Sequence, residues 1–378
     1  MSDSKKIAVF VTSTGWGGLE MNTLKLSRLL KAKGFDLTLF TQDNSTIIQY
    51  HKDVFNQVEV IKKRRKYFDF KTARAISKRL KTNNINVVFV VDNKDLDVLA
   101  WTKGLFFKEL KIIYQQHMQI GINKKDFLHT KRFKSIDTWI SPLPFLKVEI
   151  GLRTHFPLKR VEVVPIGIDT SKFLKHKYSK QEAREKLGIH TDLPLLGIIG
   201  RISEKKGQKF VAEALLALKS KGSHVELVIF GSATINDEAD KKYDQELRQF
   251  VIENDLSRQV HFTEYQEDVH QFYNSIDVFV LASHSETYGM VTIEAMLSGI
   301  PVIATNSGGT PGILGNGKLG HLYPFEDHDK FIKELKLVLN EMEKTRQMTS
   351  SAKEIAATLY DEKAELDSIV NILNRYLK

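Results

Sequence analysis

Short runs of apolar and β-branched residues alternate with helix-like segments along most of this chain. Within each run the apolar residues follow one another without polar alternation, which is typical of parallel strands covered by helices on both faces. The first connecting segment, residues 19–34, carries leucines at helical spacing and ends in a glycine, as helices often do. The alternation therefore predicts an α/β fold with doubly wound parallel sheets. The expected strands lie at residues 6–12, 37–41, 58–61, 86–91, 111–116, 138–141, 161–165, 195–200, 225–231, 260–262, 277–283 and 301–305.

The strand pattern occurs twice and lapses between residues 173 and 193, where a loop and the short helical segment KQEAREKLG occur. We therefore expect two Rossmann-like domains, residues 1–168 and residues 169–359, and a C-terminal helix at about 360–378 that packs back on the first domain. After Ile303 we expect helices and no further strand. Because ligands of open α/β sheets bind at the carboxyl ends of the strands, two facing sheets would place a ligand in an interdomain cleft.

The composition of the chain indicates the cellular compartment in which it is expected to work. The absence of cysteine excludes disulfides and thiolate metal sites and fits a reducing compartment. The apolar run after MSDSKK is too short for a signal peptide, and no stretch approaches the roughly 20 apolar residues of a membrane span. We therefore expect a cytoplasmic protein.

The formal net charge of +10 is concentrated in the first half of the chain. Residues 62–81 hold ten Lys or Arg against one Asp, and residues 103–134 hold eight against two acids. Such blocks suit a phosphorylated substrate, an anionic membrane or nucleic acid, or they are simply solvated. The sequence shows no zinc-ligand spacing, RNP-like aromatic motif or recognition helix, which argues against nucleic acid as a partner.

Aromatic residues alternate with lysines in WTKGLFFKELK, residues 101–111, and KKDFLHTKRFK at residues 124–134 continues the pattern. This is typical of a helix at a membrane interface. Peripheral attachment to the inner face of an anionic cell membrane is therefore one hypothesis. The alternative is that Phe106 and Phe107 pack the helix onto the sheet.

The octapeptide GRISEKKG, residues 200–207, follows one expected strand directly and precedes a helix at residues 208–220. A phosphorylated ligand would lie at such a strand end. Arg201 offers a bidentate fork to it and Lys206 offers a point charge, so the two cations can neutralise a diphosphate without a metal ion. The alternative is that both are solvated charges in a loop.

Two carboxylates flank a tyrosine–glycine turn in SETYGMVTIEAMLSG, residues 285–299. Glu286 comes just after an expected strand, and the amides of Tyr288, Gly289 and Met290 lie at the start of an expected helix, where phosphate binds readily. Glu294 lies about one turn further on, roughly 6 Å along the helix axis from Met290. Its apolar neighbours predict that it is partly buried and has a partner. The order of groups matches the sugar, diphosphate and ribose of a nucleotide sugar.

The stretch ETYGMVTIEAMLSGIPVIATNSGG resembles the E-x7-E element of the GT4 family of retaining glycosyltransferases, which have the GT-B fold of two facing Rossmann-like domains. Four further stretches resemble motifs of the family, in the family's order. They are the glycine-rich loop and first helix at residues 15–41, the interdomain segment VVPIGIDTSKF, the octapeptide GRISEKKG and the strand YNSIDVFVLAS.

The resemblance implies a role for each matching residue. Glu294 would bind the ribose hydroxyls and Glu286 the transferred sugar, while Arg201 and Lys206 would bind the diphosphate. His117, after the strand at residues 111–116, would lie near the reacting sugar, although a histidine at a strand end is also a common structural residue. The implied catalytic residues are Glu286, His117, Arg201 and Lys206, and the implied donor-binding residues are Gly17, Gly18, Arg201, Lys206, Glu286, Thr287, Tyr288, Gly289, Met290, Val291 and Glu294.

The resemblance further implies transfer of a hexose-type sugar, with retention, from a nucleotide-diphosphate sugar to an acceptor hydroxyl. We expect a UDP-sugar first and a GDP-sugar second, a saccharide or lipid-linked saccharide acceptor, and no metal or other cofactor. Lipopolysaccharide, cell-envelope glycan or glycolipid synthesis would be the setting. The alternatives are an epimerase or hydrolase of sugar nucleotides with the same fold, and a non-catalytic binding subunit.

Overall fold

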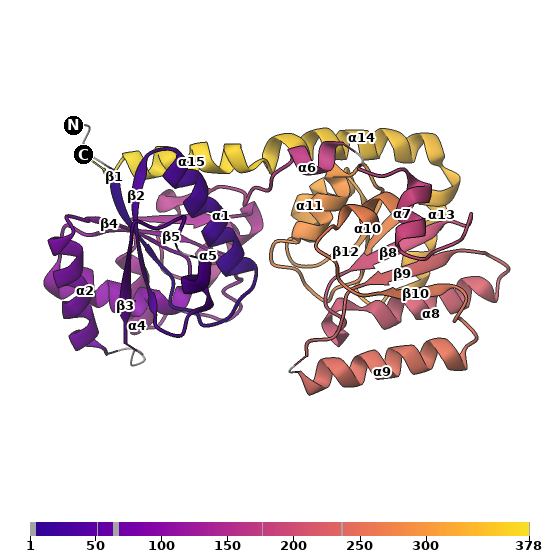
Figure 1. The fold of residues 1–378 in the computed structure, drawn as a ribbon, viewed down its shortest axis with the longest axis horizontal. Coiled ribbons are helices and arrows are strands. Elements are labelled where there is room, and N and C mark those ends of the chain that lie inside the picture. Colours follow the sequence, from indigo (N-terminus) through magenta and orange to yellow (C-terminus); the bar gives the residue numbers. More distant parts are fainter. Residues whose placement is uncertain (1–4, 51, 63–67, 176, 236, 378) are drawn as a thin grey trace. The chain divides into compact units, whose positions relative to one another are not determined.

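The computed structural model describes residues 5–50, 52–62, 68–175, 177–235 and 237–377. The chain forms two compact units (Figure 1). The first unit comprises Met1–Gly167 together with Glu362–Lys378, and the second comprises Ile168–Asp361. Part of the predicted basic block at residues 62–81 lies outside the described residues, namely residues 63–67.

The first unit is built on a parallel sheet of seven strands among its described residues, in the order β3-β2-β1-β4-β5-β6-β7. The order reverses next to β1, where two βαβ halves meet, as in a Rossmann fold. All neighbouring strands are parallel, and β1 pairs with β2 so that Ile7 lies opposite Leu37. The strands are β1 (Lys5–Phe10), β2 (Phe35–Gln42), β3 (Gln57–Ile61), β4 (Val87–Val90), β5 (Lys111–Gln115), β6 (Thr138–Ser141) and β7 (Val161–Val163).

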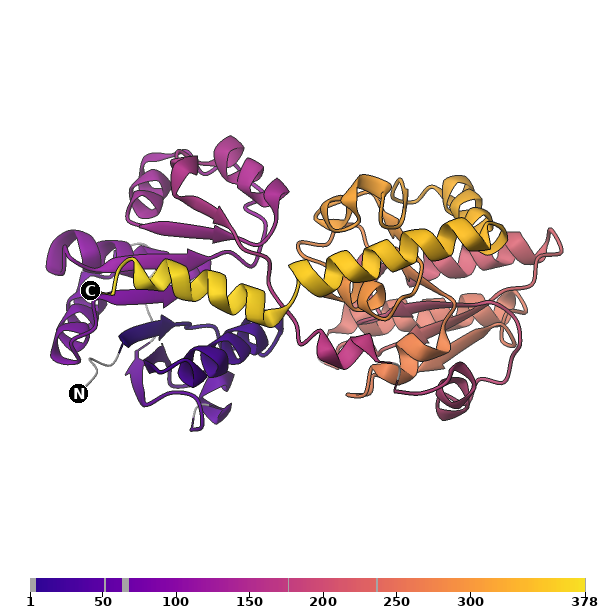
Figure 2. The same ribbon diagram turned by 90° about the horizontal axis from the view of Figure 1, so that it is seen from above.

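Successive residues of these strands enter different cores. Ile7 and Val9 of β1 pack in one core with α1 and α15, whereas Ala8 and Phe10 pack in another with α2, α3 and α4. Helices therefore cover both faces, which is why the strands are apolar without alternation. Figure 2 shows α15 lying along this sheet. The helices are α1 (Gly18–Ala32), α2 (Phe70–Thr82), α3 (Leu96–Trp101), α4 (Phe127–Lys134), α5 (Pro144–Arg153) and α15 (Glu362–Asn374), with 3₁₀ turns η1 (Thr46–Tyr50), η2 (Asn93–Asp95) and η4 (Leu158–Arg160) and a π-helical turn η3 (Thr102–Phe106).

The second unit repeats the plan with a parallel sheet of six strands among its described residues, in the order β10-β9-β8-β11-β12-β13. Helices α8, α9 and α13 share one core with the sheet, and α10 and α11 contact β8, β11 and β12. The strands are β8 (Leu195–Ile199), β9 (Glu226–Phe230), β10 (Val260–Thr263), β11 (Val278–Leu281), β12 (Val302–Thr305) and β13 (His321–Tyr323). The helices are α6 (Ser171–Leu174), α7 (Lys180–Lys186), α8 (Gln208–Lys219), α9 (Glu238–Glu253), α10 (His270–Ser275), α11 (Met290–Leu297), α12 (Thr310–Ile313), α13 (His328–Asn340) and α14 (Met342–Leu359), with 3₁₀ turns η5 (Glu204–Lys206) and η6 (Gly315–Gly317).

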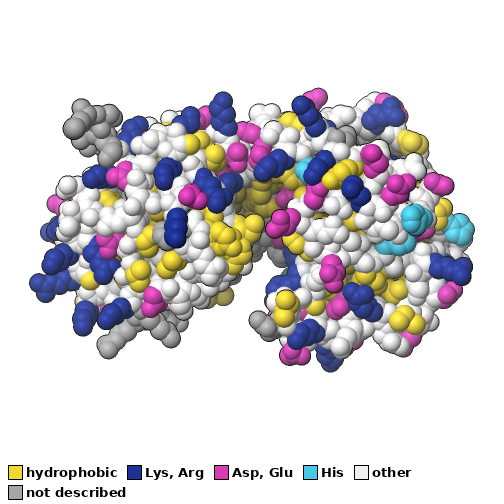
Figure 3. Space-filling model, in the orientation of Figure 1, with side chains coloured by type: hydrophobic (Ala, Val, Ile, Leu, Met, Phe, Trp, Pro, Cys, Tyr) yellow, Lys and Arg dark blue, Asp and Glu magenta, His cyan; other side chains and the backbone are white. Residues whose placement is uncertain are grey.

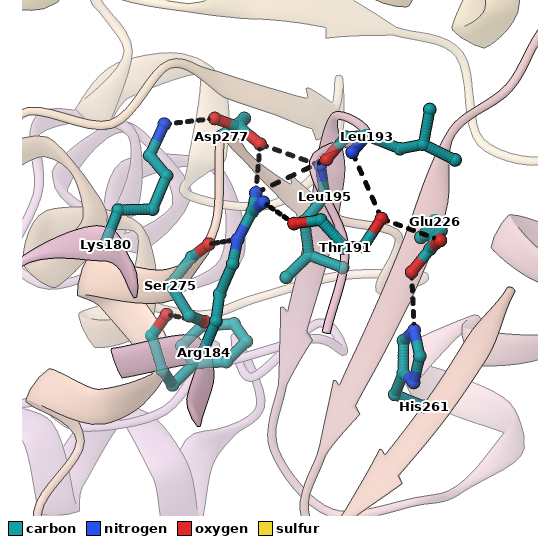
Figure 4. Close-up of polar contacts among 10 residues, drawn as sticks. Lys180, Arg184, Thr191, Leu193, Leu195, Glu226, His261, Ser275 and Asp277 are labelled. Carbon is teal, nitrogen blue, oxygen red and sulfur yellow. Dashed lines mark hydrogen bonds and ion pairs between the residues drawn. The ribbon is translucent and has the colours of Figure 1, made fainter. Parts of the chain in front are cut away.

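A polar network holds α7 against the amino ends of the strands of the second sheet (Figure 4). The buried Arg184 donates from Nη2 to Asp277 Oδ2 over 2.7 Å and from Nε to the Ser275 carbonyl over 3.0 Å. The Leu195 amide donates to the same Asp277 oxygen over 2.8 Å. The network therefore joins α7, the segment between α10 and β11, and the start of β8, at the end of the sheet opposite the carboxyl ends of the strands.

Two expectations from the sequence were wrong. The strand β13 follows Ile303, although we expected none there. It consists of His321, Leu322 and Tyr323 between Gly320 and Pro324, so it has no β-branched residue and no long apolar run to mark it as a strand. Residues 101–111 do not form one interfacial helix: α3 ends at Trp101 and the π-helical turn η3 follows, while Phe106 and Phe107 are partly buried against the core. The packing alternative therefore holds for these two rings.

The α/β fold with parallel sheets is confirmed, and each of the twelve expected strands is present. None of the helices described in residues 5–50, 52–62, 68–175, 177–235 and 237–377 is long and apolar enough to cross a membrane.

Candidate active site

Three loops at the carboxyl ends of β8, β11 and β12 are bound to one another in the second unit. The His284 amide donates to the Lys205 carbonyl over 3.0 Å, which ties the loop after β11 to the octapeptide after β8. The Gly309 amide donates to the Glu286 carbonyl over 2.7 Å, which ties the same loop to the one after β12. The predicted site residues of this unit therefore stand on a connected edge of the sheet.

Two glycines allow these loops to approach closely. Gly207 has a φ of +72°, and a Cβ atom there would lie 2.3 Å from the Ala282 carbonyl oxygen. Gly308 has a φ of +59°, and a Cβ atom there would lie 2.2 Å from the Glu286 carbonyl oxygen. Any other residue would combine an unfavourable backbone conformation with an overlap against backbone atoms.

Lys206 and Glu286 lie together at the centre of this edge. Lys206, on the turn η5, has its Nζ 2.5 Å from Glu286 Oε1, and Ser283 Oγ donates to the same oxygen over 3.0 Å. The two charged side chains are 30% and 17% exposed, respectively. The residues predicted to hold a diphosphate and a sugar are thus direct neighbours, each accessible from solvent.

Arg201 contacts residues other than Lys206 and Glu286. Its Nε lies 3.5 Å from Asp240 Oδ2 on α9, and its Nη1 lies 3.5 Å from Thr234 Oγ1. Both distances are at the limit of a hydrogen bond or ion pair, and half of the side chain is exposed. The arginine is therefore weakly held, and its pairing with Lys206 on one diphosphate stays a prediction.

The helix α11 begins immediately after Gly289, whose φ of +73° turns the chain into its first residue, Met290. The first amides of a helix lack intrahelical acceptors, so the amides of Met290 and Val291 suit an anion. Thr287 is half-buried, and Tyr288 is buried with its ring edge-on to Tyr360 of the same unit. The predicted turn at the helix start is thus present, and its contact with a donor stays a prediction.

Glu294 has the partner that its apolar surroundings demand. The hydroxyl of Tyr273, a buried residue of α10, donates to Glu294 Oε2 over 2.7 Å and also lies 3.2 Å from the Val291 carbonyl oxygen. Burial raises the pKa of Glu294 to about 7, and the hydrogen bond from Tyr273 opposes that rise. Tyr273 could not be predicted from the sequence as the partner of Glu294, because it lies 21 positions upstream and no spacing rule links the two residues.

His117 lies in the first unit, just past the end of β5. It lines a cavity of about 220 Å³ together with Asp92, Lys124 and Trp139, among others. Burial, and next the positive charge of Lys25, lower the pKa of His117 to about 4, so the imidazole is neutral at physiological pH. Its Nε2 is buried and has no hydrogen-bond partner in the described part of the chain. The ring therefore retains an unused polar atom at the carboxyl edge of this sheet.

Gly17 and Gly18 lie at the start of α1 in the first unit. The Gly17 amide donates to Glu20 Oε2 over 2.9 Å, and Ser13 Oγ donates to the other oxygen of that carboxylate. A Cβ atom at Gly18 would meet nothing within 4 Å, and one at Gly17 would meet only Glu20 Oε2, at 3.7 Å. Packing within the described residues therefore leaves open space at both glycines, and the approach of a ligand there stays a prediction.

Models of known protein families match residues in both units. A model described as Glycosyltransferase Family 4 matches residues 16–172, and one described as Glycosyl transferases group 1 matches residues 179–355. The lipopolysaccharide core mannosyltransferase LpsB of Rhizobium meliloti is 29% identical over 39% of this chain and 40% of its own length. The capsular polysaccharide glycosyltransferase CapM of Staphylococcus aureus is 26% identical over 56% of this chain and 53% of its own length. The chain thus spans about half the length of the curated relatives it matches.

Solved structures resemble the chain over its whole length. A glycosyltransferase from Rickettsia africae superposes with a TM-score of 0.86 at 17% identity, covering 100% of this chain and 99% of that one. Anabaena HepE, solved in complex with UDP, superposes with a TM-score of 0.84 at 18% identity, covering 98% of this chain and 100% of that one. At such identities the likeness shows the fold, which is GT-B. The paired family matches and the curated relatives place the chain in the GT4 family of glycosyltransferases.

Proposed function

We propose that the chain transfers a hexose-type sugar from a nucleotide-diphosphate sugar to an acceptor hydroxyl, with retention of configuration. The observation that carries the proposal is the Lys206–Glu286 pair, which stands just before the start of α11, with Glu294 inside the helix. Glu286, the amides at the start of α11 together with Lys206, and Glu294 then match in turn the sugar, the diphosphate and the ribose of a sugar nucleotide. Ribose hydroxyls donate hydrogen bonds well to a carboxylate such as that of Glu294. Tyr273 donates to one oxygen of this carboxylate, Oε2, and the other oxygen is the proposed acceptor for the ribose.

UDP is the proposed nucleotide, with GDP second. The support is that Anabaena HepE, which shares the fold, was solved with UDP and with UDP-glucose. We further propose that no metal ion is needed, because Lys206 and Arg201 can together neutralise a diphosphate. The proposed cytoplasmic location rests on the cysteine-free composition.

In the proposed reaction the bond between the anomeric carbon and the β-phosphate oxygen breaks, and its electron pair stays on the phosphate. Lys206, Arg201 and the amides at the start of α11 would stabilise the charge that develops there. The acceptor oxygen bonds to the anomeric carbon and gives its proton to the departing phosphate oxygen, either directly on the leaving-group face or after a covalent intermediate. His117 would contribute as a neutral imidazole that hydrogen-bonds the sugar.

The proposed acceptor is a saccharide or lipid-linked saccharide of lipopolysaccharide, capsule or another cell-envelope glycan. The names of LpsB and CapM support this class. A peripheral membrane contact of the first unit is part of the proposal. Phe68 and Phe70 surround Trp101 at the surface, and Lys131 Nζ lies 4.4 Å from the centre of the Trp101 ring. Aromatic rings beside cations suit the interface of an anionic bilayer.

The test is to incubate the protein with radiolabelled UDP-glucose, UDP-galactose or GDP-mannose, with and without lipid-linked saccharides extracted from a bacterial envelope. We expect one donor to yield a labelled glycoside with the anomeric configuration of the donor. The variant Glu286→Gln should abolish the product, whereas Glu354→Gln, on the exposed face of α14, should not. Free sugar alone would favour the hydrolase, and nucleotide binding without turnover would favour the binding subunit.

A further inference from the structure

Two large aromatic rings are stacked at the surface of the first unit instead of being buried. The rings of Trp16 and Tyr50 have their centroids 4.3 Å apart at an interplanar angle of 24°. Trp16 is 41% exposed and Tyr50 is 44% exposed, and the neighbouring Met21 on α1 is 56% exposed. Hydrophobic side chains are visible at the surface near α1 in Figure 3. We refer to Trp16 and Tyr50 together as the aromatic platform.

The platform is held in place by the loops that carry it. Ser45 Oγ donates to the Ser13 carbonyl over 2.6 Å, and Thr46 Oγ1 donates to the Thr14 carbonyl over 3.0 Å. Ile47, in the same turn as Tyr50, is fully buried and anchors η1 to the core. The loop after β1 and the loop after β2 are therefore fixed to each other. As a result, the two rings are pre-organised for a ligand rather than loosely solvated.

We propose that the aromatic platform binds a pyranose ring of the acceptor saccharide by stacking. This inference rests on the proposed glycosyltransferase function. The C–H face of a pyranose is apolar while its hydroxyls point outward from the ring edge, so an aromatic ring removes the apolar face from water and leaves the hydroxyls free to hydrogen-bond. Thr14, Asp43 and Gln49, which are exposed on the same two loops, offer polar groups suited to hydroxyls.

The position of the platform in the fold agrees with an acceptor site. Trp16 immediately precedes Gly17 and Gly18, where packing within the described residues leaves open space that a ligand can enter. The platform also stands at the carboxyl ends of β1 and β2, the edge at which ligands of open α/β sheets bind.

The charge and the exposed area of the platform favour a sugar over an anionic membrane and over a second copy of the chain. Residues 13–22 and 43–50 contain no Lys or Arg, so the two segments that carry the platform supply none of the cations that hold an anionic bilayer. About two-fifths of each of the two residues is exposed, which amounts to roughly 100 Å² per residue. A stable interface with a second copy of the chain needs about 800 Å² from each partner, whereas this smaller area suits one or two sugar rings.

The test uses ¹⁹F NMR on protein labelled with 5-fluorotryptophan. The chain has three tryptophans, so the Trp16 resonance can be assigned from the variant Trp16→Phe. The probes are the methyl α- and β-pyranosides of glucose, galactose and mannose, titrated with and without UDP. Sorbitol, which has the hydroxyls but no ring face, is the control. We expect at least one glycoside to shift the Trp16 resonance saturably while that of Trp101, which packs against the core that α2, α3 and α4 share with the sheet, stays unchanged.

The variant Tyr50→Ala should weaken that glycoside binding about tenfold, and Tyr50→Phe, which keeps the stack, should restore it. UDP affinity, measured by calorimetry, should be the same in all three proteins. If no glycoside moves the Trp16 resonance, the proposal is overturned. A shift caused by UDP alone and competed by no glycoside would also overturn it, because the platform would then stack the base. Failure of the transferase proposal would instead appear as loss of UDP binding and turnover with the glycoside shift intact.

Discussion

Lys206 Nζ lies 2.5 Å from Glu286 Oε1, so the cation predicted to bind the diphosphate neutralises the carboxylate predicted to bind the sugar. The pair exists because Gly207 lets the loop after β8 approach Ala282 at the end of β11. Without donor each charge has the other as its partner. A donor that places its phosphate at Lys206 and a sugar hydroxyl at Glu286 gives both groups new partners, which avoids leaving either charge unpaired.

Replacing Lys206 by alanine should lower kcat/KM for the donor about 10²–10³-fold, because a cation aimed at the developing phosphate charge acts mainly in the transition state. Steady-state kinetics with whichever donor yields a labelled glycoside would measure this. Lys205→Ala is the matched control, since that side chain is exposed and the loop uses only its carbonyl. Equal losses in both variants would contradict a specific role for Lys206.

Gly207→Ala should destabilise the second unit and reduce activity. Gly222→Ala is the control, since Gly222 has a φ of +73° but a Cβ atom there would meet nothing within 4 Å. Both variants should lose about 1–2 kcal/mol from the strained backbone, and Gly207→Ala should lose a further ~1–3 kcal/mol from the overlap with Ala282. Urea denaturation measures the difference, and indistinguishable midpoints would show that the loop relaxes freely.

Nucleotide affinity should rise as pH increases through the pKa of Glu294, about 7. The ionised carboxylate accepts more hydrogen bonds from ribose hydroxyls than the protonated acid does. His117, with a pKa of about 4, stays neutral across this range. Calorimetry with UDP between about pH 6 and pH 8 would measure the profile.

Tyr273→Phe should shift that profile to higher pH, because it removes the hydrogen bond that holds the pKa of Glu294 down. Tyr323→Phe removes another buried hydroxyl, which lies 3.5 Å from the Leu281 carbonyl, and should leave the profile unchanged. If the UDP affinity of the wild type did not change with pH, Glu294 would have no role in nucleotide binding.

Arg184→Ala should reduce the free energy of unfolding by about 3 kcal/mol, because Asp277 loses its buried partner and keeps only Lys180 and the Leu195 amide. Lys180→Ala, whose side chain is 55% exposed, should cost less than about 1 kcal/mol. Denaturant titration would test both. UDP affinity should not change, since the network lies at the amino ends of the strands. A loss of affinity in a folded Arg184→Ala protein would contradict this separation.

Much of the fold can be predicted from the sequence because uninterrupted apolar runs mark buried parallel strands, as at Val87–Val90. The strand β13 was not predicted because its residues, His321, Leu322 and Tyr323, include no β-branched residue of the kind that marked the other strands. Within the site, spacing along one helix placed Glu294 a turn beyond Met290, but the Tyr273 hydroxyl reaches it from α10, and such a contact depends on packing between helices. The pairing of Lys206 with Glu286 likewise depends on how two loops approach each other, which local sequence does not encode.

Binding of a nucleotide by α11 and its flanking loops can be measured by calorimetric titration of UDP, GDP and ADP in EDTA. We expect one nucleotide, UDP first, to bind without metal. Glu294→Ala should weaken its binding at least tenfold, which corresponds to the loss of one charged hydrogen bond. Glu354→Ala, on α14, should bind like the wild type. If none of the three nucleotides binds, or if Glu294→Ala binds as tightly as the wild type, the assignment of this site is contradicted.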